Sequence, residues 1–205
     1  MSKTRLEAFS DGVIAILITI MVLEIRAPHG DDWSSLRIVV PSLLTYLLSF
    51  VLVGIYWNNH HHMLQATDRI NGATLWANLH LLFWLSLVPF VTSWMGENHY
   101  EAVPTAAYGI VLLGCGIAYT ILLRTLLAAQ PRKQSRLAAA IGSDVKGYLS
   151  LALYAAAIPL AFVHQAIADA LYVTVALIWL VPDRRIESRL QASRDGVERE
   201  LPGDA

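Results

Sequence analysis

Long stretches without Asp, Glu, Lys or Arg dominate the chain. Four of them are long enough to cross a hydrocarbon core of about 30 Å as a helix, and they cover 38–67, 70–96, 102–123 and 147–168. Two shorter stretches are further candidates: 12–23, which is flanked by Asp11 and Glu24, and 170–182, which reaches spanning length only if Asp169 lies at the membrane interface. The pattern therefore predicts six membrane-spanning helices, with approximate spans 5–26, 37–62, 71–96, 103–129, 146–166 and 167–183.

Composition supports an all-α, multi-pass protein of the cell membrane whose partner is the lipid bilayer. Of the 205 residues, 56% are hydrophobic and 15% are charged, whereas a soluble domain carries about 25% charged residues. Six helices use nearly the whole length, so no extramembrane catalytic domain fits and we expect no enzyme activity. A net charge of −1 argues against nucleic-acid binding, and the single cysteine, Cys115, argues against a multi-cysteine zinc site.

The basic residues predict the orientation. With the N-terminus in the cytoplasm, only Arg26 and Arg37 of the 15 Lys and Arg residues lie outside, as the positive-inside rule requires. Both termini are then cytoplasmic, with a six-helix domain at 1–183 and a charged tail at 184–205. Six acidic residues fall on the outer side: Glu24, Asp31, Asp32, Glu97, Glu101 and Asp169. They either concentrate cations there or form an ordinary solvated surface.

The first predicted helix is the most polar of the six. Ionisable residues inside a span usually face protein or water, which favours a central position for this helix. Its apolar residues Ile16, Ile20 and Leu23 recur at i, i+4 and i+7 and so form one stripe, with Thr19 beside it. The stripe is either packed apolar surface or the lining of a pore, and the neighbouring polar residues favour the pore.

Three motifs in the first half of the chain carry a family resemblance. The run Arg5-Leu6-Glu7-Ala8-Phe9-Ser10-Asp11 fits R-x-x-x-F-S-D, and Trp57-Asn58-Asn59-His60 provides a tryptophan-x-x-histidine segment. Further on, Leu75-Trp76-Ala77-Asn78-Leu79 precedes Leu87-Val88-Pro89-Phe90. In this order and spacing, the sequence resembles the bacterial members of the transmembrane protein 175 family of potassium-permeable channels.

The resemblance implies a homotetramer in which four copies of the first helix line one pore. The chain has no T-V-G-Y-G filter, and in the family apolar side chains of the first helix form the constriction instead. The narrowest position falls on Ile16, the next two layers on Ile20 and Leu23, and the threonine linked to selectivity on Thr19. The implied function is a channel that prefers potassium over sodium, with permeant potassium ions and no cofactor.

A set of polar residues is expected to hold the pore helix in place. By topology they lie near the cytoplasmic ends of the first three helices, and the matching residues of the family form an interhelical hydrogen-bond network. Charged groups at low dielectric need such partners. The set comprises Arg5, Ser10, Asp11, Trp57, His60 and Asn78.

Other functions remain open on the residues alone. The triplet His60-His61-His62 suggests a metal, but consecutive helical side chains point about 100° apart and cannot easily chelate one ion, so we predict no metal site. An intramembrane enzyme using that triplet lacks visible carboxylates nearby. A small proton-coupled secondary transporter is the main alternative, because Pro41, Pro89 and Pro159 can break helices, but no acidic residue lies mid-span in the four long helices.

Overall fold

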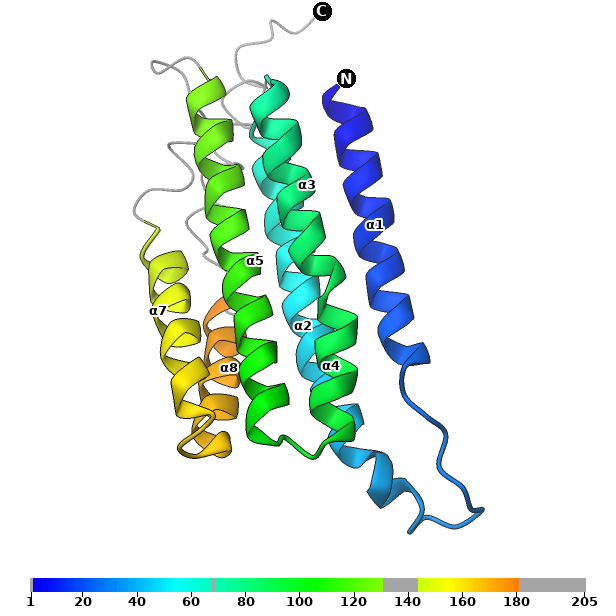
Figure 1. Ribbon diagram of the computed structural model, residues 1–205. Helices are drawn as coiled ribbons and strands as arrows, with labels where there is room; N and C mark the ends of the chain where they lie inside the picture. The colour runs from blue at the N-terminus through cyan, green and yellow to red at the C-terminus, as the bar shows by residue number, and fades with distance from the viewer. Residues whose placement is uncertain (1, 68, 131–143, 181–205) are drawn as a thin grey trace, which may run out of the picture.

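The computed structural model describes residues 2–67, 69–130 and 144–180, and every regular element in these ranges is a helix (Figure 1). In chain order the helices are α1 (Lys3–Leu23), α2 (Leu36–Gln65), α3 (Gly72–Ser86), α4 (Val88–Glu97), α5 (Ala102–Ala129), α7 (Val145–Leu160) and α8 (Gln165–Leu180).

The described helices form an all-α membrane bundle, as the sequence predicted. Four segments are long and apolar enough to cross a membrane: α1, α2, α5, and α3 with α4 as one stretch of 26 residues. Helices α7 and α8 are apolar but shorter, with 16 residues each. The predicted tail at 184–205, the end of the last span at 181–183 and the basic residues Arg132, Lys133 and Arg136 lie outside the described residues.

Polar side chains mark where several helices begin. The hydroxyl of Ser2 accepts a hydrogen bond from the backbone N–H of Arg5 (3.4 Å), and Asn71 Oδ1 accepts one from the N–H of Thr74 (2.9 Å). Such caps satisfy N–H groups that have no partner inside the helix. The third span bends at Leu87, where α3 ends and α4 begins, because Pro89 lacks the N–H that a continuous helix would need there.

Helix α5 is the centre of the bundle and packs against α3, α4, α7 and α8. It buries Tyr108 and Cys115 completely. Gly114 allows a close approach, since a Cβ at this position would lie 2.4 Å from the indole of Trp84. A residue without a side chain is therefore required where α5 meets the third span.

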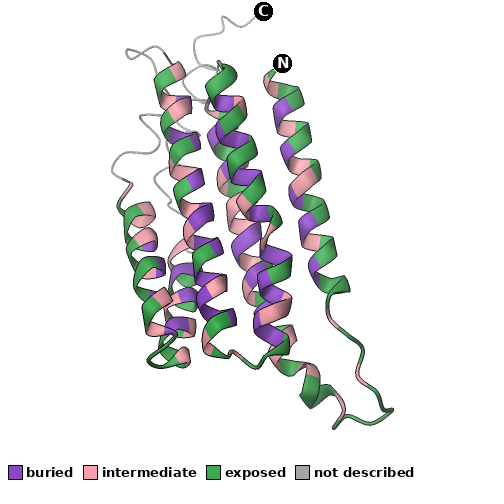
Figure 2. Cartoon of the chain, in the orientation of Figure 1, coloured by how far each residue is buried: buried purple, intermediate pink, exposed green. Residues whose placement is uncertain are grey.

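Helix α1 lies at one margin of the bundle, and α7 and α8 lie at the other (Figure 1). It packs against α2, α3 and α4. Its surface alternates between buried and exposed positions (Figure 2), so the fold of one chain covers only part of this helix.

Candidate functional site on the first helix

The buried side of α1 is a regular stripe. Its five buried residues recur every three or four positions, which is the spacing of one helical face; they are Leu6, Ser10, Ile14, Leu17 and Met21. Ile14 has no exposed surface, and Met21 has 1%. This face anchors α1 to the rest of the chain.

The residues predicted to line a pore are all on the uncovered side. Ile16 is 56% exposed, Ile20 38% and Leu23 79%. Phe9 continues the exposed apolar surface toward the N-terminal end of the helix. In a membrane protein, such a face meets lipid, another subunit or a water-filled path.

Thr19 lies on the same uncovered side and is exposed. Its hydroxyl donates a hydrogen bond to the backbone carbonyl of Ile16 at 2.8 Å. The only hydrogen of this hydroxyl is therefore used, and the oxygen is left with lone pairs that can only accept. Acceptor oxygens are the groups that stabilise a cation.

A buried chain of hydrogen bonds joins α2, α3 and α1. The Nε2 atom of His60 is 2.8 Å from Asn78 Oδ1, which can only accept, so Nε2 donates. The Nδ2 atom of Asn78 donates to Ser10 Oγ at 2.9 Å, and Ser10 donates to the carbonyl of Leu6 at 2.9 Å. All three polar side chains are at most 1% exposed, so loss of any one leaves buried partners unsatisfied.

A second bond, nearer the surface, also connects α1 and α2. The indole Nε1 of Trp57 donates to Asp11 Oδ1 at 3.0 Å. The imidazole of His61 stacks on the same indole and pairs with Gln65 at 2.8 Å. Asp11 is thus held by a partner on α2 rather than left as an isolated charge in the membrane.

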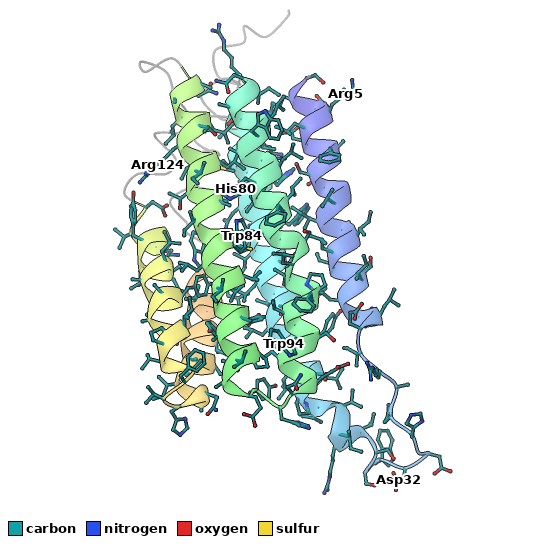
Figure 3. The ribbon with its side chains drawn as sticks, in the orientation of Figure 1. Arg5, Asp32, His80, Trp84, Trp94 and Arg124 are labelled. Carbon is teal, nitrogen blue, oxygen red and sulfur yellow. The ribbon has the colours of Figure 1, made fainter. Side chains whose placement is uncertain are left out.

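Arg5 is the one residue of the predicted network that the structure does not bring into contact with the others. Its side chain is exposed and has neither a hydrogen bond nor an ion pair within the described part of the chain. It lies at the N-terminal end of α1, whereas Asp32 lies in the loop beyond the other end (Figure 3). Among the described residues no group of three His, Cys, Asp or Glu could hold a metal.

Sequence reasoning missed two polar contacts. The Nζ atom of Lys3 donates to the carbonyl of Gln65 at 3.2 Å and lies 3.9 Å from Glu7, which ties the start of α1 to the end of α2. In the bundle centre, Ser49 bonds both Thr92 (2.7 Å) and Tyr108 (2.9 Å). Small polar residues within apolar runs were the only signal for this second cluster.

The end of the molecule beyond the C-terminus of α1 carries the acidic residues predicted for the outer side. Glu97 pairs with Arg26 at 3.3 Å, with the Arg26 side chain 88% exposed. The hydroxyls of Ser35 and Ser34 donate to the Asp32 carboxylate at 2.6 and 2.9 Å, and these bonds hold the pKa of Asp32 below its ordinary value. Asp32 is therefore charged at neutral pH.

The fold and the first helix, which is anchored on one face and uncovered on the other, define a multi-pass membrane protein. Residues 5–89 match the family model described as endosomal/lysosomal potassium channel TMEM175. The chain is 52% identical over 191 residues to a potassium channel of Chryseobacterium sp. (strain P1-3), covering 93% of this chain and 99% of that one. It is therefore a member of the TMEM175 family.

Two further comparisons agree. A potassium channel of Streptomyces collinus is 35% identical over 126 residues, covering 58% of this chain and 61% of that protein. The crystal structure of a lysosomal potassium-selective channel TMEM175 homolog from Chamaesiphon minutus superposes with a TM-score of 0.72 at 28% identity, covering 87% of this chain and 96% of that one. The family and these relatives are channels rather than enzymes.

Proposed function

We propose that this protein is the subunit of a homotetrameric potassium channel that prefers potassium over sodium. The 1–183 region forms the channel domain and 184–205 a charged tail, with both termini in the cytoplasm. The names of the relatives support potassium as the permeant ion. The observation that carries the proposal is the uncovered apolar face of α1, on a helix fixed to its neighbours by buried polar bonds.

One chain cannot enclose a pore with a single helix, so several copies must share an axis. The face free for that axis carries Ile16, Ile20, Leu23 and Thr19. The bonds of α1 through Asn78 and Asp11 fix the rotation of this helix about its axis. A helix that faced only lipid would not require a fixed rotation. The polar bonds therefore serve orientation, with the apolar stripe turned to the axis.

Rings of Ile16, Ile20 and Leu23 side chains give a narrow apolar bore. Such a bore excludes water until the helices widen or rotate, which is gating by dewetting. A bore without strong ligands favours the ion that gives up its hydration more cheaply, which is potassium rather than sodium. The Thr19 hydroxyl oxygens, with their lone pairs free, sharpen this preference as weak ligands beside the bore.

The direct test is planar-bilayer recording of the purified protein under mixed potassium and sodium gradients. A reversal potential close to the potassium equilibrium value is expected, with currents that do not saturate as a carrier does. Equal permeability to the two ions would refute the selectivity. Flux that requires a proton gradient would instead favour the secondary transporter.

Substitution of Ile16 tests the constriction. The Ile16→Asn change is expected to hydrate the bore, raise the conductance and reduce selectivity. The matched control is Ile110→Asn, because Ile110 on α5 is 49% exposed, close to the 56% of Ile16, but lies on the central helix away from α1. If both variants conduct like the parent protein, Ile16 does not line the pore.

A further inference from the structure

A small cavity lies where α2, α5, α7 and α8 meet, and no residue of α1 lines it. Its volume is about 40 Å³, which is room for about three water molecules. The wall combines apolar side chains with a few hydrogen-bonding ones, the composition of a small-molecule site. The hydrogen-bonding and aromatic part of the wall consists of Tyr56, Asn59, Tyr119, Ser150, Tyr154 and Trp179.

Three phenol hydroxyls reach this cavity without a protein partner. Within the described part of the chain, no hydrogen bond engages the hydroxyls of Tyr56, Tyr119 or Tyr154. Tyr154 is only 2% exposed. The fully enclosed side-chain atoms that lack a partner there are Nδ1 of His60 and Oδ1 of Asp169, so the three hydroxyls open onto free space. Tyr154 is buried, whereas Tyr56 and Tyr119 are half-buried. Because a tyrosine hydroxyl away from water normally finds a partner, a molecule in the cavity can supply one here.

The wall also defines the chemistry of the occupant. Among the described residues that line the cavity there is no Asp, Glu, Lys, Arg or His, so this wall offers an ion no counter-charge at low dielectric. Leu52, Ile55 and the indole of Trp179 favour an apolar body, and the indole N–H is already used on Ser150 at 2.8 Å. The phenol hydroxyls and the Asn59 amide favour one hydrogen-bonding group on that body.

The cavity shares α2 with the machinery that holds the first helix. Tyr56 and Asn59 face the cavity, and the next residue after each, Trp57 and His60, bonds to α1 or to Asn78. A rotation of α2 about its axis therefore moves both faces together. A ligand that rotated α2 from within the cavity would thereby act on α1 without touching it.

We propose that this cavity binds small uncharged amphiphiles of the size and chemistry of a short-chain alcohol, and that occupancy is transmitted through α2 to α1. The effect on conduction rests on the proposed channel function. Binding itself does not, so the two parts are measured separately.

Binding is tested with 1-propanol on the full-length protein in detergent. The chain contains eight tyrosines, so incorporation of 3-fluorotyrosine gives eight ¹⁹F resonances per chain, each assigned by the loss of its signal in a Tyr→Phe variant. The resonances of Tyr56, Tyr119 and Tyr154 are expected to shift saturably, with half-saturation in the millimolar range that so small a ligand allows. Tyr46, on α2 but outside the cavity, is expected to show only a linear solvent shift.

A substitution that fills the cavity with a larger side chain tests the site, and a similar substitution outside the cavity is its control. Thr120 lines the cavity and donates to the carbonyl of Gly116, four residues before it; Thr174 on α8 donates to Ala170 in the same way but does not line the cavity. Thr120→Leu is expected to weaken 1-propanol binding about tenfold or more, and Thr174→Leu to leave it unchanged. Equal linear shifts at all tyrosines would overturn the proposal. It would also be overturned if the three cavity tyrosines showed a deuterium isotope shift but no saturable response to 1-propanol, because the cavity would then hold only water.

Conduction is then recorded in bilayers with and without 1-propanol. Transmission through α2 is supported if 1-propanol changes the potassium current of the parent protein and of Thr174→Leu but not that of Thr120→Leu. Saturable binding with unchanged current in a conducting protein would overturn the transmission. Absence of any potassium current in the parent protein would instead refute the proposed function, while the ¹⁹F result on binding stands.

Discussion

Helices α1 and α5 are both long, apolar and able to span a membrane, but they are held in opposite ways. Thirteen of the 28 residues of α5 are buried, against five of the 21 residues of α1. Helix α5 is fixed by dense packing on several sides, including the close approach at Gly114. Helix α1 is packed on one side and oriented by bonds from Trp57 and Asn78.

The two helices therefore differ in how freely each can rotate within the bundle. A helix packed on several sides cannot rotate without disrupting the core, because protein interiors are close-packed. A helix with one free face can change its rotation at modest cost, provided that a few polar bonds set its resting position. Membrane hydrogen bonds average only about 0.6 kcal/mol, which suits such a role.

The largest effect is expected from substitutions at glycines, one on each helix. Gly114→Ala places a methyl group 2.4 Å from the Trp84 ring, and overpacking of this kind costs about 1–3 kcal/mol. Gly12→Ala meets nothing within 4 Å inside the chain, and alanine favours a helix over glycine by about 1 kcal/mol. Thermal unfolding in detergent is expected to show a lower Tm for the first variant only. Equal losses would mean that α1 is packed as tightly as α5.

The next effect concerns the buried bond chain. Asn78→Leu removes the partners of His60 and Ser10 together, and buried unsatisfied groups cost about 1–3 kcal/mol. The control on the α5 side is Thr92→Val, after which Ser49 keeps its bond to Tyr108. We expect Asn78→Leu to lower stability more and to alter the current, measured by denaturant unfolding and bilayer recording. A larger change in current for Thr92→Val would contradict the anchoring role.

These contacts mark the boundary of what the sequence could predict. Three spans followed from long runs without charges, and the exposed stripe of Ile16, Ile20 and Leu23 from helical periodicity. The charge-free run 147–168, in contrast, is divided in the structure between α7, which ends at Leu160, and α8, which begins at Gln165. Ser10, Asp11, Trp57, His60 and Asn78 were singled out through motifs, but the pairing of Asn78 with Ser10 joins residues 68 positions apart. Such pairing depends on how three helices pack, which no local pattern encodes.

Other features were beyond prediction for the same reason. Arg5 was expected among the anchoring residues because a charge in a membrane needs a partner, but its place at the helix end leaves it exposed. The cavity with its three unpartnered tyrosine hydroxyls arises from four helices at once. From sequence alone, a tyrosine in an apolar run is predicted to be a packed core residue, because its neighbours on other helices are not known.

A smaller effect is expected for the outer of the two anchoring bonds. Trp57→Phe removes the bond to Asp11 while keeping an aromatic ring for His61. The loss of stability should be about 0.6 kcal/mol. The control is Ser86→Ala, which removes an exposed bond to the carbonyl of Phe83 within α3. Open probability in single-channel records is expected to change for Trp57→Phe and not for Ser86→Ala; the reverse pattern would show that the Trp57 bond does not orient α1.

The smallest effect is expected at Asp32 in the loop after α1. A carboxyl whose pKa is lowered in the folded state contributes stability above its ordinary value of 3.8, and loses it as the pH falls through the lower folded value. The difference in Tm between Asp32→Asn and the parent protein should therefore stay constant between about pH 5 and 8. A difference that grows across that range would mean that another group, not the Asp32 carboxyl, controls this loop.

The central claim is that the uncovered face of α1 lines a shared ion path. Because the single cysteine, Cys115, is buried, thiols introduced elsewhere can be modified selectively. The measurement is the potassium current of Ile20→Cys and Leu23→Cys before and after a charged, water-soluble thiol reagent, with Ile117→Cys on α5 as control, 43% exposed. Loss of current is expected at both α1 positions and none at Ile117. Unchanged current at the α1 positions of conducting channels, or equal loss at Ile117, would contradict it.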